Sequence, residues 1–215
     1  MGILYLMAAA NPLKAQKKVS ELTLVYDYSI GLEGNEPKQP TGPDAAIHTV
    51  YIKGSKSRSE MTNPLFSSTT FFDATTGGGV ILKEVSGQKL LIRLNADNWA
   101  EHNSLYDGLV LNDTAGTKEI AGYKCVKAIG RTRSGATITV FYTKDVLPQN
   151  REYEPQFRSL EGLPLEYELT NGNVKIRYRV SKISFNPVTV SKFDIPKTGY
   201  REMNYAESKK SNMGG

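Results

Sequence analysis

The stretch from Gly162 to Val180 constrains the fold of this chain more than any other. Two runs of alternating apolar and polar residues flank Asn171-Gly172, and an Asn-Gly dipeptide between such runs is typical of a two-residue hairpin loop. With this loop, every apolar residue faces an apolar partner and each carboxylate faces a cation. The expected pairs are Leu169 with Val174, Tyr167 with Ile176, Leu165 with Tyr178, Leu163 with Val180, Glu168 with Lys175, and Glu166 with Arg177.

This pairing predicts a sheet with one apolar face and one polar face. A shift of one residue would turn all the apolar partners toward water, so burial determines which side chains share a face. A one-sided antiparallel sheet must be covered on its apolar face. The nature of that cover therefore decides the function.

The rest of the chain indicates further strands of an antiparallel meander. Ser86-Gly87 predicts another hairpin turn, which would pair Ile81 with Ile92 and Leu82 with Leu91. The segment 31–43, rich in Pro and Gly, predicts a loop. The expected strands cover residues 21–28, 47–53, 56–62, 66–72, 79–83, 82–85, 89–94, 122–129 and 136–143.

Two short segments have helical character. Asn95 is a suitable N-cap for a helix that runs to His102 and carries Trp99, the only Trp in the chain. A Trp on such a helix either plugs the core or lies near the entrance of a cavity. Residues 201–210 also have some helical propensity. The sequence thus predicts an all-β fold with minor α content, in which one curved antiparallel sheet and one or two short helices form a half-open barrel.

The N-terminal residues 1–16 are expected to be a signal peptide. A short apolar run, Ile3 to Ala10, is followed by Asn11-Pro12 and by a possible cleavage site after Ala15. The alternative is that these residues form a first strand or short helix of the fold. We expect export, one β-rich domain at 17–206 and a disordered tail at 207–215. No run of about 20 apolar residues predicts a membrane span.

Charge and motifs favour binding over catalysis. The net charge of +5 comes from cations and anions that alternate along the strands, which indicates solvated faces rather than a nucleic-acid surface. No metal-ligand or nucleophile motif surrounds His48 or His102, so we predict no metal, no cofactor and no enzyme activity. A cleft that gathers these histidines with carboxylates would reverse that prediction. Cys125, the single cysteine, is expected to be a buried inert thiol.

Three stretches of the chain carry a resemblance when taken together: residues 120–125 (IAGYKC), 139–143 (TVFYT) and 162–167 (GLPLEY). They resemble the GLPGLI-type exported β-rich proteins of Gram-negative envelopes, whose function is unassigned, and this resemblance implies a periplasmic protein of a Gram-negative envelope. The naming motif is matched by Gly162-Leu163-Pro164, whereas Leu165-Glu166 stand where the family has Gly-Leu. The architecture is also similar to the LolA and LolB lipoprotein carriers, and this resemblance implies a sheet wrapped around a hydrophobic cavity under short helices.

Two functions follow as hypotheses. The first is a monomeric envelope binding protein that holds a lipid-like or other apolar ligand on the concave face of the sheet. Its expected lining is Leu165, Tyr167, Ile176 and Tyr178, with Trp99 near the entrance. The alternative is an interaction or assembly factor with a filled core, which would bind a protein partner through strand edges or the 31–43 loop. An internal void of several hundred cubic ångströms would favour the first.

Overall fold

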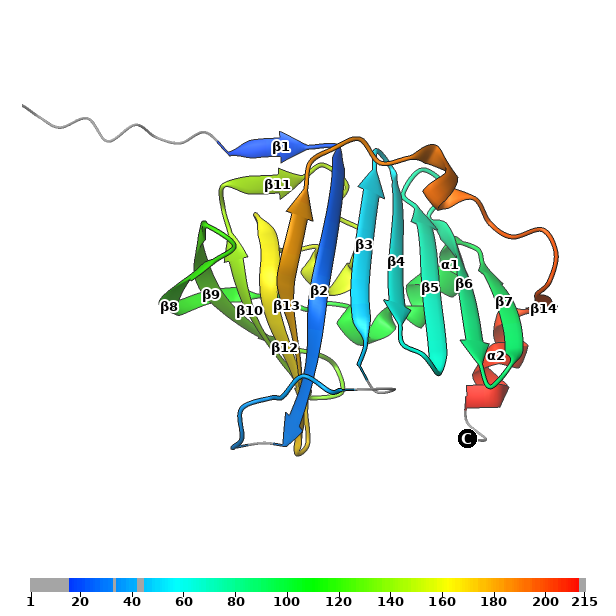
Figure 1. The fold of residues 1–215 in the computed structure, drawn as a ribbon, viewed down its shortest axis with the longest axis horizontal. Coiled ribbons are helices and arrows are strands. Elements are labelled where there is room, and N and C mark those ends of the chain that lie inside the picture. The colour runs from blue at the N-terminus through cyan, green and yellow to red at the C-terminus, as the bar shows by residue number, and fades with distance from the viewer. Residues whose placement is uncertain (1–15, 33, 42–44, 213–215) are drawn as a thin grey trace, which may run out of the picture.

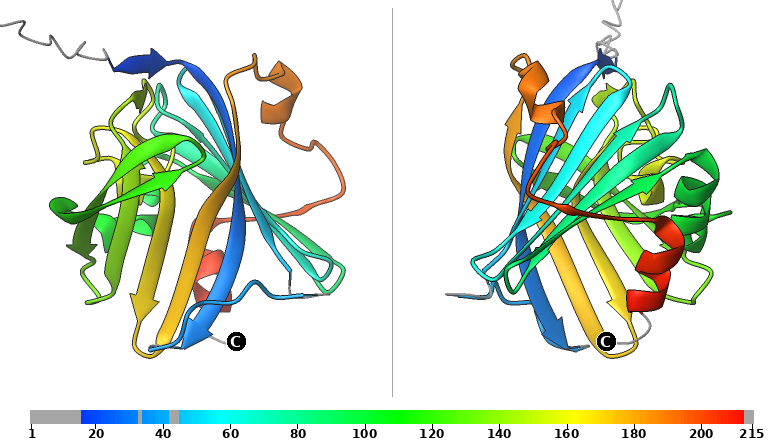
Figure 2. Two further views of the ribbon diagram at one scale, coloured as in Figure 1. Left: turned by 60° about the vertical axis from the view of Figure 1, so that its left-hand side comes forward. Right: turned by 90° about the vertical axis from the view of Figure 1, so that its right-hand side faces the viewer.

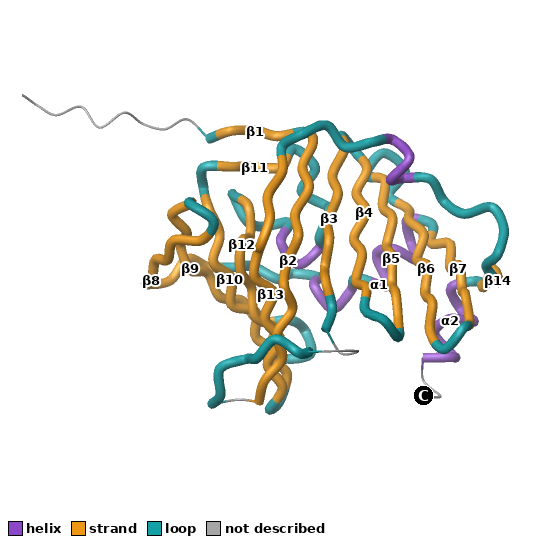
Figure 3. Tube along the Cα trace, in the orientation of Figure 1, coloured by secondary structure: helices purple, strands orange, loops and turns teal. Residues whose placement is uncertain are grey.

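A computed structural model describes residues 16–32, 34–41 and 45–212 (Figures 1 and 3). The expected signal peptide at 1–16 therefore lies outside the described residues, except for Gln16. The strands are β1 (Lys17–Val19), β2 (Glu21–Leu32), β3 (Ile47–Lys53), β4 (Lys56–Thr62), β5 (Phe66–Asp73), β6 (Gly78–Val85), β7 (Gln88–Leu94), β8 (Asn112–Ile120), β9 (Tyr123–Arg131), β10 (Thr137–Thr143), β11 (Val146–Pro148), β12 (Leu163–Asn171), β13 (Val174–Ser184) and β14 (Arg201–Met203). The helices are α1 (Ala96–His102) and α2 (Tyr205–Asn212), with 3-10 helices η2 (Ser104–Tyr106), η3 (Pro155–Phe157) and η4 (Val190–Phe193).

Within the described residues, twelve strands form one large sheet in the order β14-β7-β6-β5-β4-β3-β2-β13-β12-β10-β9-β8. Two meanders, β2 to β7 and β8 to β13, meet where β2 pairs with β13. All neighbours are antiparallel except β14, which runs parallel to β7. The sheet curls strongly without closing (Figure 2), and β1 pairs with β11 in a separate two-stranded sheet across one end. The predicted fold class, a curved and half-open β-barrel with minor helix, is confirmed.

The alternation of side chains along the strands gives the sheet an inner and an outer face. The inner face carries Leu22, Leu24 and Tyr26 of β2, all fully or almost fully buried. They pair with Ile52, Val50 and His48 of β3. Helices α1 and α2 lie on the inner side of this sheet, behind it in the view of Figure 1 (Figures 1 and 2). Because period-2 patterns place alternate residues on one face, the sequence located most strands within one or two residues.

The predicted register of the β12–β13 hairpin is wrong by two residues, although the faces are right. The loop is Gly172-Asn173 rather than Asn171-Gly172, and Asn171 pairs with Val174. Gly172 has φ = 56° at the first loop position, where glycine is favoured in type II′ turns. The facing pairs are Leu169 with Ile176, Tyr167 with Tyr178, Glu168 with Arg177, and Glu166 with Arg179. A two-residue shift preserves the face of every side chain.

The predicted helix around Trp99 is present as α1. The Asn95 side chain caps it by accepting a hydrogen bond from the Asn98 backbone N–H at 2.8 Å. Trp99 stacks on Phe72 with ring centroids 4.4 Å apart and covers Gly79, where a side chain would collide with the indole. Trp99 is therefore a core residue of the β5–β7 half of the sheet.

The C-terminal segment differs from the sequence prediction. It crosses the outer face at η4, adds β14 to the β7 edge, and ends in α2 on the inner side (Figure 2). The predicted disordered tail at 207–215 is wrong for residues 207–212, which belong to α2. A capping box stabilises this helix, since the Asn204 side chain accepts from the Glu207 N–H while Glu207 accepts from the Asn204 N–H.

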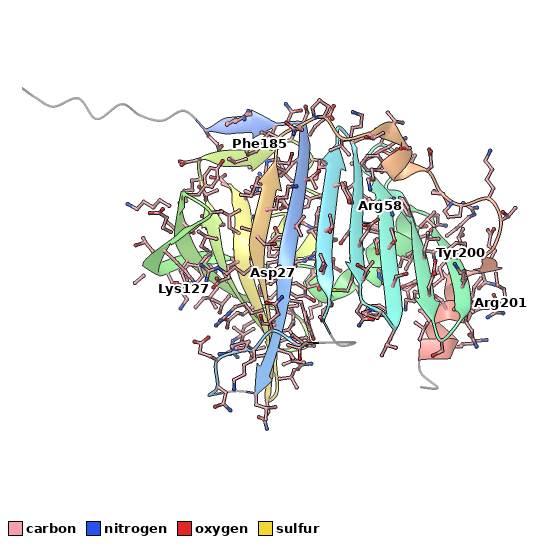
Figure 4. The ribbon with its side chains drawn as sticks, in the orientation of Figure 1. Asp27, Arg58, Lys127, Phe185, Tyr200 and Arg201 are labelled. Atoms are coloured by element: carbon pink, nitrogen blue, oxygen red, sulfur yellow. The ribbon has the colours of Figure 1, made fainter. Side chains whose placement is uncertain are left out.

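The outer face is largely polar and is tied to this crossing segment. Arg58 lies on the outer face (Figure 4), and its Nη1 donates to the Lys192 carbonyl at 2.6 Å. Tyr200, also labelled in Figure 4, donates its hydroxyl hydrogen to Glu84. The crossing segment thereby covers an apolar strip of the outer face formed by Phe71, Val80, Leu82 and Leu91.

Candidate functional site

The main cover of the inner face is a segment that the sequence analysis did not identify. Residues 150–160, here called the plug, lie between β11 and β12 and include η3. Tyr153, Phe157 and Leu160 of the plug are buried among the inner-face residues of the sheet. Asn150 anchors the plug by donating from Nδ2 to the Ser55 carbonyl at 2.9 Å. The middle of the half-barrel is therefore filled.

The predicted lining residues do not gather around one cavity. Leu165 has no exposed surface and Tyr167 is 3% exposed, so both belong to the filled core. Ile176 and Tyr178 are half-buried and line a cavity at one end of the barrel. Trp99 lies in the separate α1 cluster, away from that cavity.

This end cavity has a volume of about 500 Å³. It lies on the inner face where β2 ends and where β4 turns into β5, at the lower end of Figure 1. Its walls are mainly apolar and aromatic side chains from β2, β4, β5 and β13, with the stretch before β3 completing the rim. The lining residues are Tyr28, Ile30, Pro40, Ala46, Met61, Asn63, Phe66, Ile176 and Tyr178.

An aromatic cluster separates the end cavity from the filled core. Tyr178 stacks on Tyr167 with ring centroids 4.7 Å apart and an angle of 20° between the rings. Its ring also meets Tyr28 and His48 edge-on, at 5.6 and 5.4 Å. Burial raises the pKa of the Tyr28 and Tyr178 phenols, so both stay neutral at physiological pH. The cavity floor is therefore aromatic and uncharged.

Beneath this floor, His48 belongs to a buried polar network that reaches the plug. The Ser59 hydroxyl donates to Glu154 Oε1 at 2.9 Å, so its oxygen must accept from His48 Nε2–H, 2.8 Å away. Glu154 Oε1 also lies 3.4 Å from His48 Nε2. Gln156 Nε2 donates to Glu154 Oε2 at 2.6 Å. The other imidazole nitrogen, Nδ1, lies 3.2 Å from the Tyr167 hydroxyl.

This network brings together one of the predicted histidines, a serine and a carboxylate, yet its geometry differs from a nucleophile relay. In a Ser-His-acid triad, the serine and the carboxylate contact opposite nitrogens of the imidazole. Here Ser59 and Glu154 both face Nε2 of His48, and a tyrosine faces Nδ1. Within the part of the chain that the structure describes, no hydrogen bond joins His102 to the network, although His102 lines a cavity with Ser59 and Glu154. The arrangement supports binding and positioning more than acyl transfer.

A second hollow of similar size, about 480 Å³, lies at the opposite ends of the strands. The β5–β6 turn, with Thr76 and Gly78, forms part of it, and Phe193 and Ile195 of the crossing segment form another part. Because the crossing segment lies on the outer face, this hollow is not the concave-face site that the sequence predicts.

Several simpler sites find no support in the described part of the chain. No group of three or more His, Cys, Asp or Glu in residues 16–32, 34–41 and 45–212 could hold a metal ion. None of the helices described is long and apolar enough to cross a membrane. Cys125 is fully buried as predicted, and burial, together with the negative charge of Glu166, raises the pKa of its thiol to about 11.

Comparison with known proteins identifies a fold but no family. No family model matches the sequence, and no curated protein sequence matches it. The resemblance to GLPGLI-type proteins therefore stays a prediction. Among solved structures, PNGF-II matches 88% of this chain with a TM-score of 0.55 at 14% identity. The match covers 33% of the length of PNGF-II. At this identity the match shows a shared fold alone.

Two further solved structures match with TM-scores below 0.5. The crystal structure of MucB matches 83% of this chain and 58% of its own, with 14% identity and a TM-score of 0.39. A LolA superfamily protein from Nitrosomonas europaea matches 82% of this chain and 90% of its own, with 10% identity and a TM-score of 0.36.

The residues of the Gly162-Leu163-Pro164 motif have structural roles. A side chain at Gly162 would collide with the Thr143 carbonyl, so only glycine fits there without a shift of the backbone. Leu163 has no exposed surface. The Pro164 carbonyl accepts a buried hydrogen bond of 2.8 Å from the Tyr26 hydroxyl. The motif therefore builds the junction of β10, β12 and β2 and does not contribute to the end cavity.

Proposed function

We propose that this protein is an exported envelope protein that binds a lipid-like or other apolar ligand in the end cavity, without catalysis. The observation that carries the proposal is the cavity itself, about 500 Å³ in volume and lined mainly by apolar and aromatic side chains. Ligand pockets are typically 300–1,000 Å³ with such a lining and few polar groups. Export rests on the sequence of residues 1–16 and on the resemblance given above.

Exposed apolar side chains around the cavity support this assignment. Ile30, which lines the cavity, is 42% exposed. Ile176 and Tyr178, which also line the cavity, are only half-buried. Removing such surface from water contributes about 25 cal/mol per Å² of apolar area. An apolar ligand would gain this contribution from both the walls and the rim.

A protein partner is the second candidate, and a specific observation favours it. The middle of the half-barrel is filled by the plug, so the cavity occupies only one end of the inner face. The exposed rim could then serve as an apolar patch for another protein. A ligand-binding experiment separates the two functions, because only the first requires the cavity to accept a small molecule.

The experiment titrates the protein with 11-(dansylamino)undecanoic acid, whose fluorescence rises in an apolar site, and displaces the probe with unlabelled fatty acid. Ile176→Glu places a carboxylate in the cavity wall and should weaken binding by about tenfold or more, because burying a charge without a partner is unfavourable. Val190→Glu is the matched control, since Val190 is 66% exposed on η4. Tyr167, another lining residue that the sequence predicted, is not chosen for this substitution because it belongs to the core and a charge there would disturb folding.

Saturable binding that is lost in Ile176→Glu and retained in Val190→Glu is the expected result. Far-UV circular dichroism and thermal unfolding show that each variant folds. Absence of saturable binding to the folded wild type, or equal affinity of the two variants, would contradict the proposal and favour a protein partner.

A further inference from the structure

A smaller and more polar cavity of about 270 Å³ lies between the plug, α1 and η2, over strands β4 and β5. It shares no lining residue with the end cavity. The sheet contributes Ser59 and Thr70 to its wall. The helical side and the plug contribute Trp99, His102, Asn103, Leu105, Tyr106, Tyr153, Glu154, Pro155 and Gln156. We call it the plug cavity.

The charge of the plug cavity is negative and comes from one residue. Glu154 is the carboxylate of the lining, and no Lys or Arg is part of it. Burial would raise the pKa of Glu154, but the close contact with the His48 imidazole and the hydrogen bonds from Ser59 and Gln156 outweigh burial and hold that pKa below its usual value. Burial lowers the pKa of His102, and the positive charge of Lys83 lowers it further. His102 is therefore uncharged at neutral pH and does not repel a cation.

The Glu154 carboxylate has capacity for another donor. Oε1 contacts both Ser59 and His48, whereas Oε2 receives a single hydrogen bond, from Gln156, among the described residues. A carboxylate offers about four lone-pair sites, two on each oxygen. The Glu154 side chain is 13% exposed and lines the plug cavity.

The walls around this carboxylate are aromatic. Tyr106 and Tyr153 lie close enough to Glu154 for its negative charge to raise the pKa of both phenols, in addition to the larger effect of burial. Tyr153 is 7% exposed, and its hydroxyl has no hydrogen-bond partner within the described ranges. Aromatic faces beside a buried carboxylate attract organic cations, because ring quadrupoles and the anion act in the same direction.

We propose that the plug cavity binds a primary alkylammonium group, supplied by a free amine or by the lysine side chain of a partner. The ammonium donates to Glu154 Oε2, and its alkyl chain packs against Tyr106 and Leu105. The volume of about 270 Å³ suits a small amine rather than a large ligand. An anionic ligand is disfavoured, because the cavity offers it a carboxylate and no Arg or Lys. This inference does not depend on the proposed function of the end cavity.

The test is isothermal titration calorimetry with n-butylammonium, n-butanol and the blocked peptide acetyl-Gly-Lys-Gly-amide, whose one ammonium group is that of the lysine, as separate probes. We expect n-butylammonium to bind in the millimolar range and n-butanol to bind at least about tenfold more weakly. Binding of both amine probes supports recognition of any primary amine, and binding of the peptide alone assigns the group to a lysine side chain. Equal affinity for the amine and the alcohol, or no binding of either amine probe, overturns the proposal.

Three variants test whether n-butylammonium binds in the plug cavity. Glu154→Gln keeps the shape of the side chain and should weaken n-butylammonium binding at least about tenfold. Glu152→Gln is the matched control, because Glu152 pairs with Arg158 at 3.7 Å outside this cavity and should leave affinity unchanged. Tyr106→Leu removes an aromatic wall while leaving the Glu154 network intact, and should weaken binding about twofold to fivefold. Unchanged affinity in folded Glu154→Gln or folded Tyr106→Leu overturns the proposal.

Discussion

Two substitutions of Glu154 should differ sharply in their effect on stability. Glu154→Leu leaves the Ser59 hydroxyl and the Gln156 amide without their shared acceptor. Each unsatisfied buried donor costs about 1–3 kcal/mol, although relief of the buried charge offsets part of the sum. We expect a loss of about 3–5 kcal/mol. Glu154→Gln keeps the oxygen that faces Ser59 but loses the charge assistance and replaces Oε2 with an NH₂ group, toward which Gln156 must turn its own amide oxygen, so about 1–2 kcal/mol is expected.

Urea denaturation at several pH values is the assay. The folded-state pKa of Glu154 lies below its ordinary value of 4.5, so the ionised form stabilises the fold. This contribution is fully present above the unfolded pKa and is lost as the pH falls through the folded pKa. The stability difference between wild type and Glu154→Gln should therefore be largest at neutral pH and should shrink below about pH 4.5. Equal losses for the Leu and Gln variants, or a difference that does not change with pH, would refute the reasoning.

Two further predictions concern packing and reactivity. Gly79→Ala places a methyl group against the Phe71 carbonyl and 2.9 Å from Trp99 Cζ3, so it should lower the free energy of unfolding by about 1–3 kcal/mol and shift Trp fluorescence. The exposed Thr76→Ala in the neighbouring turn is its control, and equal stability of the two variants would contradict the contact. Cys125, with a thiol pKa near 11, should react with a disulfide reagent at pH 8 only at the rate of unfolding, and rapid labelling of the folded protein would contradict its burial.

The sequence predicted most of the sheet because local signals agree with the global fold. The Ser86-Gly87 turn pairs Ile81 with Ile92 as expected, since both turn residues adopt the positive φ that such a loop requires. The β12–β13 register could not be decided in the same way. Both the predicted and the observed register keep each face intact, and the observed one still pairs Leu169 with Ile176 although it places Val174 opposite Asn171. The observed one also stacks Tyr178 on Tyr167 and pairs Tyr178 with Tyr28 of β2, a distant strand that the hairpin sequence does not specify.

The candidate sites were harder to predict, because they depend on contacts between distant residues. Ser59 and Glu154 are 95 positions apart, and no local pattern connects them. The plug did carry a usable signal, since Tyr153, Phe157 and Leu160 follow the i, i+4, i+7 spacing of one apolar face. Recognition of that spacing would have placed a cover over Leu165 and Tyr167 and moved the expected cavity to the end of the sheet.

Native mass spectrometry with organic extraction tests the central claim most directly. The protein is exported into a periplasm, purified without detergent and measured under gentle conditions, together with Ile176→Glu and Val190→Glu. The account predicts a lipid-sized adduct on the wild type and on Val190→Glu, and its loss in folded Ile176→Glu. A clean apo mass for the wild type, or an adduct that persists in Ile176→Glu, would contradict ligand binding in the end cavity.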